Sequence, residues 1–147
     1  MGWSELLSGA LVVDDHFIIA QACQAVLEPL GIGKVVSAST VDAGYQAFVE
    51  HEPDISIVDL SFDNERSGGI TLIKRMREHR PDARILVLSM RADRSSFFLS
   101  IEAGALGYVI KDSPTAEFTR AVEEVRSGRP YIDPQLALNL CFARMRH

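Results

Sequence analysis

Short apolar segments and longer amphipathic segments alternate along most of the chain. The apolar segments, rich in Val, Ile and Leu, are residues 10–14, 34–38, 55–59, 84–89 and 106–111. Most are apolar at both alternating positions, which is typical of strands buried on both faces of a parallel sheet. Because a helical stretch follows each segment, the pattern predicts five βα units joined by right-handed crossovers. The expected fold class is α/β, a doubly wound five-stranded parallel sheet with helices on both faces.

Apolar residues at helical spacing indicate which helix faces should pack on this sheet. Two such stripes are formed by Ile18, Ala22, Ala25 and Val26 and by Phe118, Val122 and Val125. Thr40 is expected to cap the N-terminus of a helix that runs to about His51. These positions predict where the second layer of the core lies.

The C-terminal tail allows two interpretations. Residues 126–135 hold two prolines and a glycine in a polar setting, which predicts a turn or a linker. After them, alternate apolar residues suit a strand, whereas a face made by Ala137, Leu138, Cys141 and Met145 suits a helix. We favour the helix. The expected organisation is a lead-in at 1–9, an α/β domain at 10–128, and a linker with a partial C-terminal helix at 129–147.

Composition narrows the class of protein. A chain of 147 residues fits one domain, and a net charge of −5 argues against nucleic-acid binding by this chain alone. The two cysteines, Cys23 and Cys141, lie in unlike contexts and are not expected to form a disulfide. No apolar run approaches the length of a membrane span, and the N-terminus lacks the features of a signal peptide. We therefore expect a cytoplasmic protein that does not contact a membrane.

Side chains with a carboxylate, a hydroxyl or an amine follow the predicted strands, at the point where each strand ends. They are Asp14 and Asp15 after the first strand, Asp59 after the third, Ser89 after the fourth and Lys111 after the fifth. Each alone has an ordinary explanation, as a helix cap, a turn residue or a solvated surface residue. Ligands of doubly wound sheets bind outside the carboxyl ends of the strands, so the topology should bring all five together. The set therefore indicates a site.

Three carboxylates at one place repel one another, so such a site needs a cation. Oxygen ligands with room for water suit Mg²⁺. An aspartate can attack phosphorus and form an aspartyl-phosphate, while a lysine and a hydroxyl stabilise the phosphoryl oxygens. The residues therefore predict phosphoryl transfer with Mg²⁺ as cofactor.

The segments "VVDDH", "IVDL", "VLSM" and "GYVIKD", in this order and spacing, resemble the receiver domain of two-component response regulators. The resemblance extends from about Leu11 to Gly128. It implies that Asp59 is the phospho-acceptor. It also implies that Asp15 and Asp59 are Mg²⁺ ligands, with Asp14 acting through water.

The same resemblance assigns further roles. The backbone carbonyl of Ser61 would be another Mg²⁺ ligand, and Ser89 and Lys111 would bind the phosphoryl group. Ser89 and Tyr108 would form the family's switch pair, in which the hydroxyl turns toward the phosphoryl group and the aromatic ring packs inward. The alternative for Tyr108 is a half-buried aromatic residue on an edge strand. The loop after Asp59 departs from the family, because "SFDNERSGG" lacks the usual proline and is one or two residues longer.

The function implied is that of a signalling receiver. A histidine kinase or a phosphotransfer protein would donate the phosphoryl group, and the only catalysis expected is self-catalysed transfer to Asp59 and slow autodephosphorylation. The segment "YIDPQLA" resembles the linker before a helix-turn-helix DNA-binding domain in one large subfamily, which suggests control of transcription. A homodimer is also expected to be feasible, through either the fourth and fifth helices or the first and fifth.

Two other functions compete with this one. A stand-alone or degenerate receiver would act only as a protein-interaction module. An Mg²⁺-dependent phosphatase with an aspartate nucleophile would need a second acid two residues after Asp59, where this chain has Ser61. The complete set of acids, hydroxyl and lysine favours the phospho-accepting receiver over both.

Overall fold

The sheet is built from parallel strands that each end at the same edge. The structure is a computed structural model, and it describes residues 8–60 and 68–145. Its strands are β1 (Ser8–Val13), β2 (Ile32–Ala38), β3 (Ile55–Val58), β4 (Ile85–Ser89), β5 (Gly107–Ile110) and β6 (Tyr131–Ile132). They pair in the order β2-β1-β3-β4-β5-β6, and every pair is parallel. The predicted α/β class with a doubly wound parallel sheet is confirmed.

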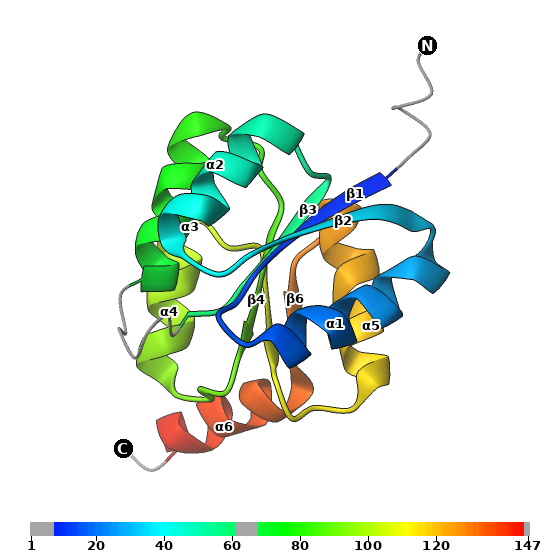
Figure 1. Cartoon of the computed structure of the whole chain (residues 1–147). Coiled ribbons are helices and arrows are strands. Elements are labelled where there is room, and N and C mark those ends of the chain that lie inside the picture. The colour runs from blue at the N-terminus through cyan, green and yellow to red at the C-terminus, as the bar shows by residue number, and fades with distance from the viewer. Residues whose placement is uncertain (1–7, 61–67, 146–147) are drawn as a thin grey trace.

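Helices cover both faces of the sheet. They are α1 (Phe17–Leu27), the short 3₁₀ helix η2 (Glu28–Leu30), α2 (Val41–His51), α3 (Gly68–His79), α4 (Arg94–Ala103), α5 (Thr115–Arg126) and α6 (Pro134–Met145). Figure 1 shows α1 and α5 on one face and α2, α3 and α4 on the other. The predicted cap is confirmed, because the Thr40 hydroxyl accepts a hydrogen bond from the Ala43 N–H at 3.1 Å.

The prediction of five strands was wrong, because β6 adds a sixth. The Tyr131 N–H donates to the Leu106 carbonyl at 3.3 Å, and the Asp133 N–H donates to the Tyr108 carbonyl at 2.9 Å. These bonds satisfy main-chain groups on the outer edge of β5, which would otherwise lie open to pairing with another chain. A strand of two residues has no periodicity for sequence reasoning to detect.

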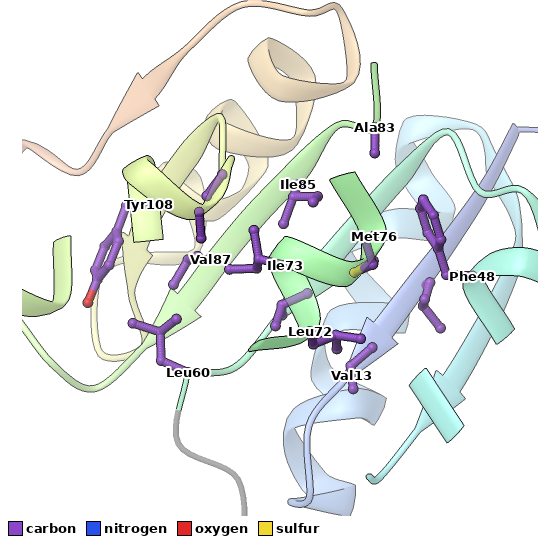
Figure 2. Packing of buried hydrophobic residues seen from close by; sticks show 14 of the residues in the cluster. Val13, Phe48, Leu60, Leu72, Ile73, Met76, Ala83, Ile85, Val87 and Tyr108 are labelled. Atoms are coloured by element: carbon purple, nitrogen blue, oxygen red, sulfur yellow. The ribbon is translucent and has the colours of Figure 1, made fainter. Parts of the chain in front are cut away.

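Each face of the sheet has its own hydrophobic cluster. One contains Leu72, Ile73 and Met76 of α3, all fully buried. Figure 2 shows these three side chains between Phe48 at one end of the cluster and Tyr108 at the other. The opposite cluster joins α1 to α5, where the predicted stripe of Phe118, Val122 and Val125 is indeed buried.

Most of the stripe predicted for α1 does not face the sheet, and of its four residues only Val26 packs against the cluster there. Ile18 is 76% exposed, and the buried residues of α1 are Ala20, Cys23 and Leu27. Two of these are small, so the helix approaches the strands closely on that side. Because α1 has apolar residues on most of its surface, its sequence does not determine which face packs on the sheet. Packing leaves the large side chain of Ile18 in solvent.

The tail forms a helix, as predicted, but packs through a different face. Leu136 is fully buried and Leu140 packs beside it against the α3 cluster, while Leu138 and Cys141 of the predicted face are exposed. In Figure 1, α6 lies across the lower end of α4. Leu140 and Cys141 border Arg94 and Phe98 of that helix. The boundary proposed at residues 128 and 129 therefore falls just before β6, which is a strand of the sheet, and α6, which packs against the core.

None of the helices in the described part of the chain is both long enough and apolar enough to cross a membrane.

Leu136 offers a test of how firmly α6 is held. Replacing Leu136 by alanine removes a fully buried side chain, which we expect to lower the free energy of unfolding by about 2–5 kcal/mol. Leu138→Ala is the matched control, because Leu138 lies on the same helix and is 53% exposed. It should change the free energy of unfolding by less than about 0.5 kcal/mol. Urea denaturation followed by circular dichroism measures both, and equal losses would contradict the docking of α6 through Leu136.

Candidate functional site

Main-chain hydrogen bonds place two aspartates side by side at the carboxyl edge of the sheet. The Asp59 N–H donates to the Val13 carbonyl, and the Asp14 N–H donates to the Ala38 carbonyl, both at 3.0 Å. The ladder therefore continues one residue beyond β1 and β3. Asp14 is 5% exposed and Asp59 is 3% exposed, so both carboxylates are withdrawn from solvent.

Four potential ligand residues gather at this point. One side-chain donor atom from each of Asp14, Asp15, His16 and Asp59 lies within 4.8 Å of the others. The His16 Nδ1 atom is 3.0 Å from Asp14 Oδ1 and 3.0 Å from Asp15 Oδ1. The structure thus brings together the three predicted acids. Sequence reasoning missed His16, whose only signal was its position directly after the two aspartates.

Lys111 supplies the positive charge that this cluster requires. Its Nζ atom lies 2.9 Å from Asp14 Oδ2 and 3.4 Å from Asp59 Oδ2, and its side chain is only 7% exposed. The Lys111 N–H donates to the Ser89 carbonyl at 2.8 Å, which fixes the lysine backbone beside β4. An ammonium between two buried carboxylates offsets their repulsion. The prediction that Lys111 joins the acids holds geometrically.

The two residues predicted as a switch pair meet at Arg91. The Ser89 hydroxyl accepts a hydrogen bond from the Arg91 N–H at 3.0 Å, and the Tyr108 hydroxyl donates to the Arg91 carbonyl at 2.7 Å. The Tyr108 ring is fully buried, with its centroid 5.7 Å from that of Phe97 in an edge-to-face arrangement. Tyr108 is therefore packed inward, and the alternative of a half-buried edge aromatic is wrong.

Burial of the Tyr108 phenol raises its pKa to about 12. A hydrogen bond from Ser89 opposes this rise, while Asp93 reinforces it. The hydroxyl is consequently protonated at neutral pH and can act as a donor to Arg91.

Cys23 of α1 lies close enough to the carboxylate cluster for the charges of Asp14 and Lys111 to affect the pKa of its thiol. Burial raises the pKa of its thiol to about 12, with Asp14 raising it further and Lys111 lowering it. The thiol is 3% exposed and therefore stays protonated. It fills part of the core beneath the site.

Gly69 lets α3 begin directly against the strand that carries Asp59. A Cβ atom there would lie 2.3 Å from the Asp59 carbonyl oxygen and 2.5 Å from the Leu60 Cα atom. The Gly69 N–H also donates to the Leu60 carbonyl at 3.2 Å. Only glycine permits this approach, so Gly69 contributes to the position of Asp59.

The donor set fits a hard divalent cation. Carboxylate oxygens from Asp14, Asp15 and Asp59 converge, as Mg²⁺ and similar ions prefer. Ser61, predicted to add its carbonyl oxygen, lies outside the described residues. So do residues 62–67 of the loop in which the sequence departs from the family pattern.

Comparison with known proteins decides the family. The family model of the response regulator receiver domain matches residues 10–123 of this chain. The chain belongs to the response regulator receiver family. This membership supports the phospho-accepting receiver over the phosphatase and the interaction module.

Curated relatives show where this receiver stands within the family. The methanol utilization control regulatory protein MoxX of Paracoccus denitrificans is 35% identical over 130 residues, which cover 88% of this chain and 58% of MoxX. The oxygen regulatory protein NreC of Staphylococcus epidermidis is 36% identical over 132 residues, covering 88% of this chain and 60% of NreC. The chain thus spans about 60% of the length of these relatives.

Solved structures agree in fold. A LuxR-family two-component response regulator from Aurantimonas sp. SI85-9A1 is 30% identical, with a TM-score of 0.85 over 95% of this chain and 99% of that chain. The receiver therefore belongs to the LuxR-type response regulators, as its tail suggested. The isolated REC domain of RcsB from Salmonella enterica serovar Typhimurium, determined with the phosphomimetic BeF3−, has a TM-score of 0.78 at 21% identity, covering 89% of this chain and 96% of that chain. That second similarity shows the shared fold.

The carboxylate cluster predicts a stability that depends on divalent cations. Mg²⁺ at 100 times its dissociation constant should raise the free energy of unfolding by about 2.7 kcal/mol. Asp15→Asn should remove most of this gain, and it should also stabilise the cation-free protein by relieving repulsion. Thermal unfolding with and without Mg²⁺ measures both effects.

Asp82→Asn, an exposed acid outside the cluster, is the control and should keep the full response to Mg²⁺. Equal responses of the two variants would show that the cluster does not bind the ion.

The raised pKa of Tyr108 predicts a loss of stability in alkali. The folded state holds this proton up to about pH 12, whereas the unfolded chain releases it near pH 10. The contribution of the protonated Tyr108 phenol to the free energy of unfolding is therefore complete below pH 10 and falls as the pH rises from 10 toward 12. Urea denaturation at several pH values should show a smaller alkaline loss in Tyr108→Phe than in the wild type, and an identical loss would contradict the assignment.

Proposed function

We propose that this receiver accepts a phosphoryl group on Asp59 from a histidine kinase or a phosphotransfer protein. The observation that carries the proposal is the placement of the Lys111 ammonium within 3.4 Å of a buried Asp59 whose neighbours are two further aspartates. This arrangement can neutralise the charge of an incoming phosphoryl group. Positioning and charge neutralisation are most of what phosphoryl transfer requires.

Asp15 and Asp59 would hold an Mg²⁺ ion directly, Asp14 would act through water, and the Ser61 carbonyl would be a further ligand. When bound, the ion supplies positive charge that offsets the acids and the phosphoryl oxygens. His16 stands at the rim of this cluster, with its side chain 63% exposed. It contacts Asp14 and Asp15 and thereby orients their oxygens.

In the transfer step, an Asp59 carboxylate oxygen attacks the phosphorus of a phosphohistidine. The new O–P bond forms as the P–N bond breaks, and the departing imidazole keeps the electron pair and takes up a proton. Lys111 moves from its contacts with Asp14 and Asp59 to a phosphoryl oxygen, and the Ser89 hydroxyl donates to another. The product is an aspartyl-phosphate, which water hydrolyses slowly.

The switch follows from a change in what Ser89 binds. Its hydroxyl accepts a hydrogen bond from the Arg91 N–H, so a turn toward the phosphoryl group releases this bond. Tyr108 then keeps its bond to the Arg91 carbonyl and fixes the segment before α4. Two conformations of this segment, with different affinities for the phosphoryl group, are enough to carry a signal.

The output of the switch is control of transcription through a DNA-binding domain, as the LuxR-type relationship suggests. This chain does not bind nucleic acid by itself, and its catalysis is limited to its own phosphorylation and dephosphorylation. A phosphorylated homodimer is compatible with the exposed apolar residues Phe17 and Ile18 on α1 and Phe98 and Leu99 on α4.

The direct test is phosphorylation by a small donor such as acetyl phosphate with Mg²⁺. We expect intact-protein mass spectrometry to show one added phosphoryl group, removed by hydroxylamine as for other acyl phosphates. Asp59→Asn should take up none. Asp82→Asn, which keeps the site intact, should react like the wild type. Equal labelling of Asp59→Asn would show that another residue is the acceptor.

A further inference from the structure

A buried carboxylate outside the acidic cluster connects the turn that bears Lys111 to the C-terminal helix. Asp133 is 1% exposed, and it follows β6 directly. Its Oδ2 atom accepts hydrogen bonds from the Ile110 N–H, at 3.1 Å, and from the Ser113 hydroxyl. Its Oδ1 atom accepts from the Gln135 N–H at 2.9 Å. The described bonds thus use both oxygens.

On one side, Asp133 clamps the turn from Ile110 to Ser113. The Ser113 N–H donates to the Ile110 carbonyl at 3.1 Å, which closes a four-residue turn with Lys111 at its second position. Asp133 binds the first and the last residue of this turn. It also takes the place of a strand partner for the Ile110 N–H, because β6 ends at Ile132. The backbone from which Lys111 reaches Asp14 and Asp59 is therefore fixed by Asp133.

On the other side, Asp133 caps α6. The bond from the Gln135 N–H is a side-chain N-cap, and the Ala137 N–H donates to the Asp133 carbonyl at 2.9 Å in the first turn of the helix. A carboxylate there also interacts favourably with the helix dipole. Leu136, next in the helix, is fully buried in the cluster that contains Tyr108 and Ile110. The start of α6 is thus fixed to the same place as the turn.

We infer that Asp133 couples the docking of α6 to phosphoryl binding at Asp59, in both directions. The inference rests on the proposed function, because it needs Lys111 to engage a phosphoryl oxygen. A lysine held by that oxygen keeps its turn in one position, and the turn offers Asp133 its two donors. Asp133 then holds the first turn of α6 against β5. By linkage, a docked α6 strengthens phosphoryl binding by the same factor.

The test uses the whole chain with Mg²⁺ and beryllofluoride, an unreactive mimic of the phosphoryl group. Hydrogen exchange followed by mass spectrometry reports the α6 amides, and calorimetric titration reports beryllofluoride affinity. In the wild type, beryllofluoride should slow exchange in α6 by about fivefold or more, as expected for ordinary coupling between two sites. Amides of α2, which lies away from the Lys111 turn, provide the internal control.

Two variants separate coupling from simple stability. Ser113→Ala removes one bond to the turn but leaves the cap from Gln135 and the burial of Leu136. Without beryllofluoride its α6 exchange should match the wild type, whereas the slowing by beryllofluoride should fall to less than half. Asp133→Asn retains a capping oxygen but replaces the other oxygen with an amide donor that faces the Ile110 N–H. It should lose most of the slowing and bind beryllofluoride more weakly by the same factor.

The outcomes distinguish the two proposals. Failure of the wild type to bind beryllofluoride would overturn the proposed function and this inference with it. Normal binding with unchanged α6 exchange would overturn the inference alone. So would a full response in both Ser113→Ala and Asp133→Asn. If Asp133→Asn does not fold, Ser113→Ala still decides the matter, because its side chain contributes little to the core.

Discussion

The contact of the Lys111 ammonium with Asp14 and Asp59 is the interaction on which this site depends. Two like charges 4 Å apart repel by about 4 kcal/mol where the effective dielectric constant is about 20, and here the acids are also withdrawn from water. The strand order places β4 between the acid at the end of β3 and the lysine after β5. A long side chain is needed to reach across, and lysine is long enough. The strand order therefore explains why a residue as long as lysine stands at position 111.

Much of this arrangement could be predicted from the sequence. Asp14, Asp59 and Lys111 were assigned to one edge because each follows a predicted parallel strand and ligands of doubly wound sheets bind outside the carboxyl ends of the strands. Main-chain hydrogen bonds continue past β1, β3 and β5, to Asp14, Asp59 and Lys111, and these bonds fix the placement. The prediction of the buried stripe on α5 was also correct, because the polar residues of this helix leave it a single apolar face.

The rest depended on packing between distant segments. The first helix has apolar residues on most of its surface, so the sequence could not tell that Ala20 and Cys23 would face the sheet rather than Ile18. The sixth strand and the buried face of α6 depend on main-chain groups of β5 and on space beside Tyr108. No spacing rule describes the contacts of His16 with the two acids, and the bonds of Asp133 to Ile110 and Ser113 join distant segments of the chain. The sequence placed Asp133 in a turn or a linker, because residues 126–135 hold two prolines and a glycine in a polar setting.

The two cysteines differ in a way that has a practical consequence. Cys23 is buried with a protonated thiol, while Cys141 is exposed on α6. Thiol reagents act on accessible thiolates, so a maleimide dye or spin label would attach to α6 and leave the core untouched. The native chain therefore carries its own single attachment point on the helix that follows Asp133. Distances or mobility at that helix can be recorded without introducing any substitution.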